Sequence, residues 1–88
     1  MSEQVLKNFL DADGRLHTIP SKHAKLLVVL DHLSQRFEPG KVYPEKDVNT
    51  ILGELHPDFA ALRRYLVENQ FLTREDGFYW RSGGTFSV

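Results

Sequence analysis

The chain has 88 residues, enough for one small domain but too few to leave room for a deep substrate cleft. Its hydrophobic content of 41% predicts a packed globule, and the absence of cysteine excludes disulfides and thiolate metal sites. The formal net charge of -1 counts against strong nucleic-acid affinity unless charges are segregated onto faces, because dedicated nucleic-acid binders are usually basic.

The N-terminal residues show a helical pattern and no targeting signal. Met1 is followed by polar residues, and no apolar run approaches the ~20 residues of a membrane helix. We therefore expect a cytoplasmic protein with no membrane contact. Apolar residues at helical spacing predict a helix over 2–10, with Ser2 as its N-cap. After a turn at 11–14, residues 15–19 can form a short strand.

A longer helical pattern begins after Ser21, the expected N-cap, and reaches about Phe37. Its buried stripe is expected to consist of Leu26, Leu27, Leu30, Leu33 and Phe37. This helix is predicted to lie at the centre of the core. A turn at 38–40 and a very short strand at 41–43 follow it.

The next helix is predicted to begin at Pro44, because a proline at the first helical position lacks only an N–H that would have no partner there. Glu45 and Asp47 suit the positive end of its dipole. Apolar residues then recur at i, i+3, i+4 and i+7: Val48, Ile51, Leu52 and Leu55.

A second short helix is predicted over 58–69. Residues 56–57 end the preceding helix, and Asp58 is the expected N-cap of this one. Such a short connection forces the two helices to pack at a steep angle, as in a helix-turn-helix. Arg64 lies opposite the apolar stripe and Arg63 on its flank; the stripe consists of Phe59, Leu62, Tyr65 and Leu66.

The last predicted element is a hairpin of residues 71–75 and 78–81, with Asp76 and Gly77 in a type I′ turn. The register pairs Arg74 with Tyr79 and Leu72 with Arg81. One face then carries Arg74, Tyr79 and Arg81, and the other carries Phe71, Thr73, Phe78 and Trp80 toward the core. Residues 82–88 are rich in Gly and Ser and are expected to fray.

Helix, tight turn, helix and hairpin form the outline of a winged helix. We therefore predict a single α+β domain over 1–88, winged-helix-like, with an N-terminal helix, a three-helix core and a C-terminal β-hairpin.

Several short motifs resemble one bacterial family, domain-of-unknown-function family 2087, between about Phe9 and Arg81. They include Ile19-Pro-Ser-Lys22, Phe37-Glu-Pro-Gly-Lys-Val-Tyr43, His56-Pro-Asp58, Leu62-Arg-Arg64 and Tyr79-Trp-Arg81. The resemblance implies a small winged-helix-like domain. Other members carry it behind a helix-turn-helix of regulator type, which suggests a link to transcription. The resemblance implies no activity and no functional residues.

The outline predicts a nucleic-acid interface formed by the 58–69 helix, the start of the preceding helix and the hairpin. Its candidate residues are Lys46, Asn49, Arg63, Arg64, Arg74, Tyr79 and Arg81.

Five of the seven candidates also have a structural interpretation. Arg64 can pair with Glu68, and Arg63 with an acid of the preceding helix or the hairpin. Arg74 and Tyr79 can form a cross-strand pair, and Asn49 can bond to the loop.

No pattern predicts catalysis, a cofactor or a metal site. The four histidines lack metal-ligand spacing, Ser21 lacks a nucleophile motif, and there is no Gly-rich phosphate loop. We expect no enzyme.

Three functions remain, and the third, an enzyme or small-ligand sensor, would require an enclosed polar pocket. The first is nucleic-acid binding, with double-stranded DNA as partner, linked to transcriptional regulation. The alternative is a non-catalytic protein-interaction or dimerisation module that contacts a protein partner or a second copy. An acid-free face shared by four cations favours DNA: Lys46, Arg64, Arg74 and Arg81. Acids interleaved with these cations favour the module: Glu45, Glu68 and Glu75.

Overall fold

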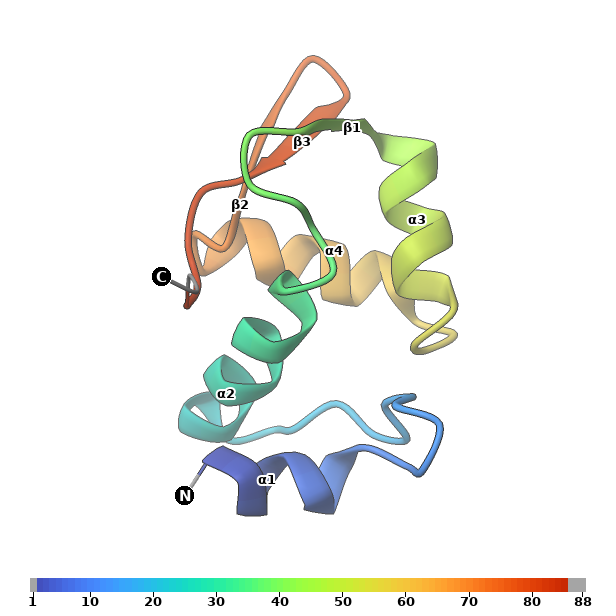
Figure 1. The fold of residues 1–88 in the computed structure, drawn as a ribbon, viewed down its shortest axis with the longest axis vertical. Helices are drawn as coiled ribbons and strands as arrows, with labels where there is room; N and C mark the ends of the chain where they lie inside the picture. Colours follow the sequence, from blue (N-terminus) through green and yellow to red (C-terminus); the bar gives the residue numbers. More distant parts are fainter. Residues whose placement is uncertain (1, 86–88) are drawn as a thin grey trace.

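The computed structural model describes residues 2–85, which form four helices and a small antiparallel sheet at one end of the molecule (Figure 1). In chain order the elements are α1 (Ser2–Phe9), α2 (His23–Ser34), β1 (Val42–Pro44), α3 (Glu45–Gly53), α4 (Phe59–Glu68), β2 (Leu72–Glu75) and β3 (Phe78–Arg81). The sheet order is β1-β3-β2, so β3 is the middle strand. The predicted α+β class with a C-terminal hairpin is confirmed, and α3, α4 and the hairpin follow one another as in a winged helix.

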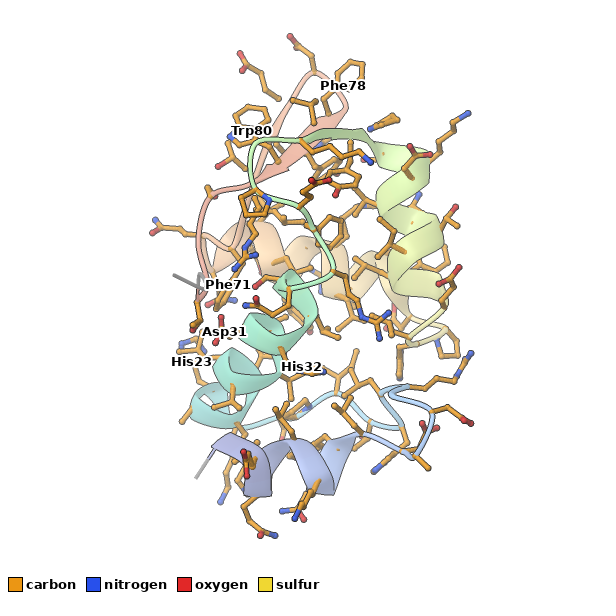
Figure 2. All side chains as sticks on the ribbon, in the orientation of Figure 1. His23, Asp31, His32, Phe71, Phe78 and Trp80 are labelled. Atoms are coloured by element: carbon orange, nitrogen blue, oxygen red, sulfur yellow. The ribbon has the colours of Figure 1, made fainter. Side chains whose placement is uncertain are left out.

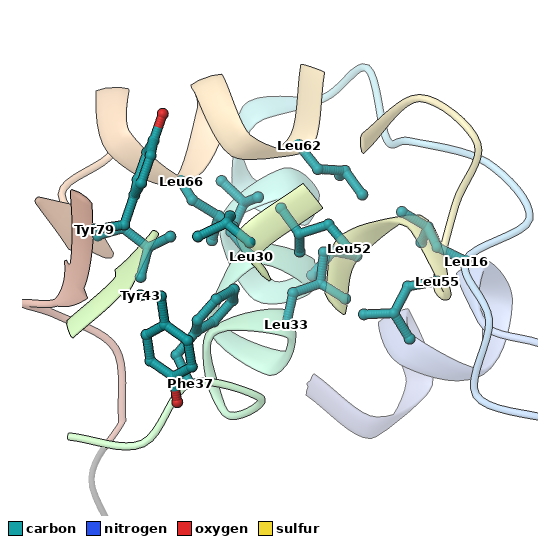
Figure 3. Packing of buried hydrophobic residues seen from close by; sticks show 13 residues of the cluster. Leu16, Leu30, Leu33, Phe37, Tyr43, Leu52, Leu55, Leu62, Leu66 and Tyr79 are labelled. Atoms are coloured by element: carbon teal, nitrogen blue, oxygen red, sulfur yellow. The ribbon is translucent and has the colours of Figure 1, made fainter. Parts of the chain in front are cut away.

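The core is one cluster of buried side chains from α2, α3, α4 and the sheet (Figure 3). Leu30, Leu52 and Leu62 are each 0% exposed, as their helical spacing predicts. Tyr43 packs edge-on against Phe37, with ring centroids 5.2 Å apart. α1 lies at the opposite end of the molecule from the sheet and packs on α2 (Figure 1).

Several predicted element boundaries differ from the structure. Residues 15–19 form no strand. Leu16 makes only an isolated bridge to Leu10. Its side chain is buried in the core, and its backbone N–H donates to Leu55 O just after α3. α2 begins at His23 with Lys22 as N-cap, not after Ser21. α2 ends at Ser34. The backbone N–H groups of residues 35–37 then donate to the carbonyl groups three residues earlier, and this tighter turn places the side chain of Phe37 in the core.

Pro44 is the N-cap of α3 rather than its first helical residue. Its ψ of 154° is extended, because Pro44 is still paired with Phe78 in the sheet. Asp58 caps α4 as predicted, since its side chain accepts a hydrogen bond from Ala61 N at 3.3 Å.

The hairpin has the predicted register and turn. Arg74 lies opposite Tyr79, and the positive φ values of Asp76 (52°) and Gly77 (82°) define a type I′ turn. The prediction of which face meets the core was wrong. Tyr79 and Leu72 are 2% and 1% exposed, whereas Phe78 is 48% exposed.

Residues 82–85, part of the tail that the sequence predicts to fray, are held against α2. Thr85 donates its backbone N–H to Asp31 Oδ1 at 2.6 Å and its hydroxyl to Asp31 Oδ2 at 2.8 Å. Gln35 donates to Thr85 O at 2.8 Å. Residues 86–88 lie outside the described residues. Between residues 2 and 85, no helix has both the length and the apolar character needed to cross a membrane.

Candidate functional site

A groove of about 380 Å³ lies between α4, the start of α3 and the hairpin. Its lining residues are Glu45, Ala60, Arg63, Arg64, Val67, Glu68, Arg74 and Tyr79. The groove thus brings together four of the seven candidate residues: Arg63, Arg64, Arg74 and Tyr79.

Glu45 is the centre of the polar contacts in this groove. Tyr79 donates its hydroxyl hydrogen to Glu45 Oε1 at 2.7 Å. The same oxygen lies 3.9 Å from Arg63 Nε and 3.9 Å from Arg74 Nη2. One carboxylate therefore serves as the counter-ion of two of the three arginines in the groove.

These contacts shift the pKa of both partners of the hydrogen bond. The bond from Tyr79, followed by the charge of Arg63, lowers the pKa of Glu45. Burial, followed by the bond to Glu45, raises the pKa of Tyr79. At neutral pH both shifts favour ionised Glu45 and neutral Tyr79, the states that form the hydrogen bond.

Arg63 lies on the flank of α4 and faces α3. It donates through Nη1 to Asn49 Oδ1 and forms the 3.9 Å ion pair with Glu45. Its side chain is only 24% exposed. The ion pair with an acid of the preceding helix, one of the two interpretations of Arg63, is therefore present, and the side chain of Asn49 bonds to α4 rather than to the loop.

Arg64 and Arg74 are the exposed cations of the groove. The Arg64 guanidinium carbon lies 5.1 Å from the centroid of the Tyr65 ring, and Glu68 lines the groove one turn later on α4. The side chain of Arg74 is 57% exposed, and its guanidinium carbon lies 6.0 Å from the Tyr79 ring centroid. The expected cross-strand arginine–tyrosine pair is present.

Arg81 lies outside this groove, and its expected place on an outward basic face was wrong. It is 8% exposed and donates through Nε to Gly83 O at 3.1 Å, through Nη1 to Phe37 O at 3.4 Å, and through Nη2 to Thr85 O. It shares a face with Tyr79, so it points toward the helices. Lys46 is exposed in the first turn of α3, next to Glu45.

The outer face of the sheet is largely apolar, and the sequence-based prediction had turned this face toward the core. We define this outer sheet face as Val42, Pro44, Thr73, Glu75, Phe78 and Trp80; cross-strand pairs connect them. Val42 is 56% and Phe78 48% exposed. A hollow of about 360 Å³ beside Val42 is lined by Gly40 and Trp80. Figure 2 shows Phe78 and Trp80 at the sheet end of the molecule, away from α1.

The alternation of apolar and polar residues could not show which face of the hairpin is exposed, because residues 78–80 place aromatic side chains on both faces of the strand. The useful signal was Leu72, which shares the face of Tyr79 and is buried with it. Within residues 2–85, no three histidine, aspartate or glutamate side chains are grouped so that they could hold a metal ion.

A known protein family matches most of the chain. No curated protein and no solved structure matches the chain significantly. Residues 15–81 match a family described as "Uncharacterized protein conserved in bacteria (DUF2087)". Because this match spans most of the chain, including α2 to β3, the protein belongs to this bacterial family.

Proposed function

We propose that the chain is a non-catalytic protein-interaction domain whose contact surface is the outer sheet face. The observation that carries this proposal is the exposure of Val42 and Phe78 on that face, beside partly buried Trp80. An antiparallel sheet with one solvated face normally carries polar residues there. A contiguous apolar patch on a small domain is characteristic of an interaction site.

The charges of the groove support the same choice. Glu45 lies between Arg63 and Arg74, Glu68 lines the groove with Arg64, and Glu75 adjoins Arg74 in the chain. Arg81, the fourth expected cation, is buried. Phosphate binding depends on cations that release counter-ions from the nucleic acid, and acids among them oppose it.

Photocrosslinking in the bacterium that encodes the chain tests the proposal. A benzophenone-bearing phenylalanine at position 42 should form a covalent adduct with a protein that mass spectrometry identifies. The matched control carries the same group at position 4, where Gln4 is exposed on α1. The adduct should disappear when the substitution Phe78→Ser is introduced into the chain that carries the crosslinker at position 42. No adduct from position 42, or equal adducts from both positions, would contradict the proposal.

Nucleic-acid binding linked to transcriptional regulation is a second candidate. It is favoured by exposed Arg64 and Arg74, which flank a groove beside the second helix of a helix-turn-helix. Fluorescence anisotropy with a labelled DNA duplex at low salt tests it. Arg64→Ala should weaken binding and lower the salt dependence by about one phosphate contact, whereas exposed Arg36→Ala should not. An absence of binding to any duplex would remove this candidate.

A further inference from the structure

We propose that the partner on the outer sheet face is a second copy of the chain, packed sheet to sheet about a two-fold axis that runs parallel to β3, midway between the two sheets. This inference rests on the proposed function, since it names the occupant of the same surface. The middle position of β3 makes the axis possible. Rotation about an axis above that strand and parallel to it places β1 of one copy over β2 of the other, as an isologous contact requires.

The apolar residues are placed for such a contact. Phe78 and Trp80 project from β3 itself, so each lies close to the axis and faces its own counterpart. Val42 of one copy then faces the β2 side of the other, where Thr73 supplies a small uncharged side chain. Two sheets packed face to face form a core of this kind in β-sandwiches.

The charges at the hairpin end of the sheet are complementary under the same rotation. Exposed Glu75 ends β2 on one edge, and it is the charged residue of the outer sheet face. On the other edge β1 ends at Pro44, and exposed Lys46 follows in the first turn of α3. The same two-fold rotation exchanges the two edges of the sheet and keeps their hairpin ends together. Glu75 of each copy therefore meets Lys46 of the other, giving two equivalent ion pairs.

The outer sheet face is smaller than the ~20–30 residues a side of a standard interface, so the dimer should be weak. Sedimentation equilibrium of the full chain up to about 1 mM should show a monomer–dimer equilibrium. Lys46→Glu and Glu75→Lys should each weaken the dimer roughly tenfold, because each makes both rim pairs repulsive. Lys46→Glu is compatible with α3, since an acid suits a helix N-terminus.

The decisive sample is an equimolar mixture of the two variants. A mixed dimer pairs the acid placed at position 46 with the lysine placed at position 75, and pairs native Lys46 with native Glu75. The mixture should therefore recover wild-type association. Lys7→Glu and Glu54→Lys, matched charge reversals at exposed positions on α1 and after α3, should leave the dimer unchanged, alone or mixed.

A wild-type monomer throughout this range overturns the inference, as does a dimer that the charge reversals leave intact or that the mixture fails to restore. These outcomes are distinct from failure of the proposed function. An adduct from position 42 to a different protein, with a monomeric chain, retains the interaction surface and removes the second copy. The absence of any adduct removes both.

Discussion

Tyr79 and Glu45 are joined by a 2.7 Å hydrogen bond that connects the middle strand of the sheet to the first turn of α3. The two residues are 34 positions apart, and the same carboxylate oxygen lies near Arg63 of α4 and Arg74 of β2. One acid thus links α3, α4 and the hairpin. The arginines that the sequence offers as a nucleic-acid surface are in part internal contacts of the fold.

Removing the hydroxyl group of this pair should destabilise the domain. Tyr79→Phe preserves the buried ring and loses only the hydrogen bond to a carboxylate, and we expect the free energy of unfolding to fall by about 1–2 kcal/mol. Urea denaturation followed by circular dichroism measures it. Tyr65→Phe, the same deletion on partly buried Tyr65 of α4, is the control and should cost less. Equal losses in both variants would contradict the role assigned to the bond.

The lowered pKa of Glu45 gives the domain an acid-sensitive contribution to stability. Because the pKa is lower in the folded than in the unfolded chain, this contribution is present above the unfolded value of 4.5 and is lost as the pH falls through the folded value. Glu45→Gln should therefore reduce the difference in unfolding free energy between pH 7 and pH 3. The control is Glu54→Gln, at the exposed C-cap of α3. An unchanged pH dependence in Glu45→Gln would contradict this assignment.

The raised pKa of Tyr79 gives the domain a contribution to stability that is lost at alkaline pH. Because this pKa is raised, the contribution is present below the unfolded value of 10.0 and is lost as the pH rises through the folded value. Ultraviolet titration of the tyrosinate band should show a tyrosine ionising above the ordinary range in the wild type. This ionisation at unusually high pH should be missing in Tyr79→Phe. Its persistence in the variant would assign the raised pKa to another tyrosine.

Arg81 should be a structural residue. Arg81→Met keeps much of the aliphatic length but leaves the carbonyl groups of Phe37, Gly83 and Thr85 without this donor. We expect a loss of about 2–4 kcal/mol in unfolding free energy, because the site is buried. Arg36→Met, at an exposed position after α2, should change it by less than about 0.5 kcal/mol. Similar effects at both positions would contradict the inward placement of Arg81.

Two glycines should respond in opposite directions to alanine. A Cβ on Gly53 would meet Phe59 Cδ2 at 3.6 Å, an ordinary contact, so Gly53→Ala should stabilise α3 by about 0.5 kcal/mol. A Cβ on Gly84 would lie 2.5 Å from Ser34 Oγ, and the φ of Gly84 is +88°. Gly84→Ala should therefore cost more than about 1 kcal/mol. Thermal unfolding checks both, and a stabilising Gly84→Ala would contradict the packing of residues 82–85 on α2.

Local sequence signals were sufficient for much of the fold. Asp58 predicted the start of α4, and Asp76-Gly77 predicted both the turn and the register of the hairpin. These features depend on residues close together in the chain. The face of the hairpin that meets the core depends on distant partners, since β1 pairs with β3 and the helices cover the side that carries Tyr79.

The candidate site was predicted only in part for the same reason. Helical spacing placed Arg64 outward and Arg63 on the flank, as the structure shows. It did not reveal Glu45 as the common partner of Arg63, Arg74 and Tyr79, because this contact exists only after α3 and the hairpin have packed together. The contacts between Asp31 and Thr85, 54 positions apart, show the same limit.

The most direct test of the interaction surface is the fluorescence of Trp80, the single tryptophan of the chain, which lies on the outer sheet face. Its emission maximum is followed as protein concentration rises, or as the protein identified by crosslinking from position 42 is added. We predict a shift to shorter wavelength as the complex forms, and loss of both shift and complex in Phe78→Ser. A complex that forms by sedimentation while Trp80 emission stays unchanged would contradict the assignment of this face.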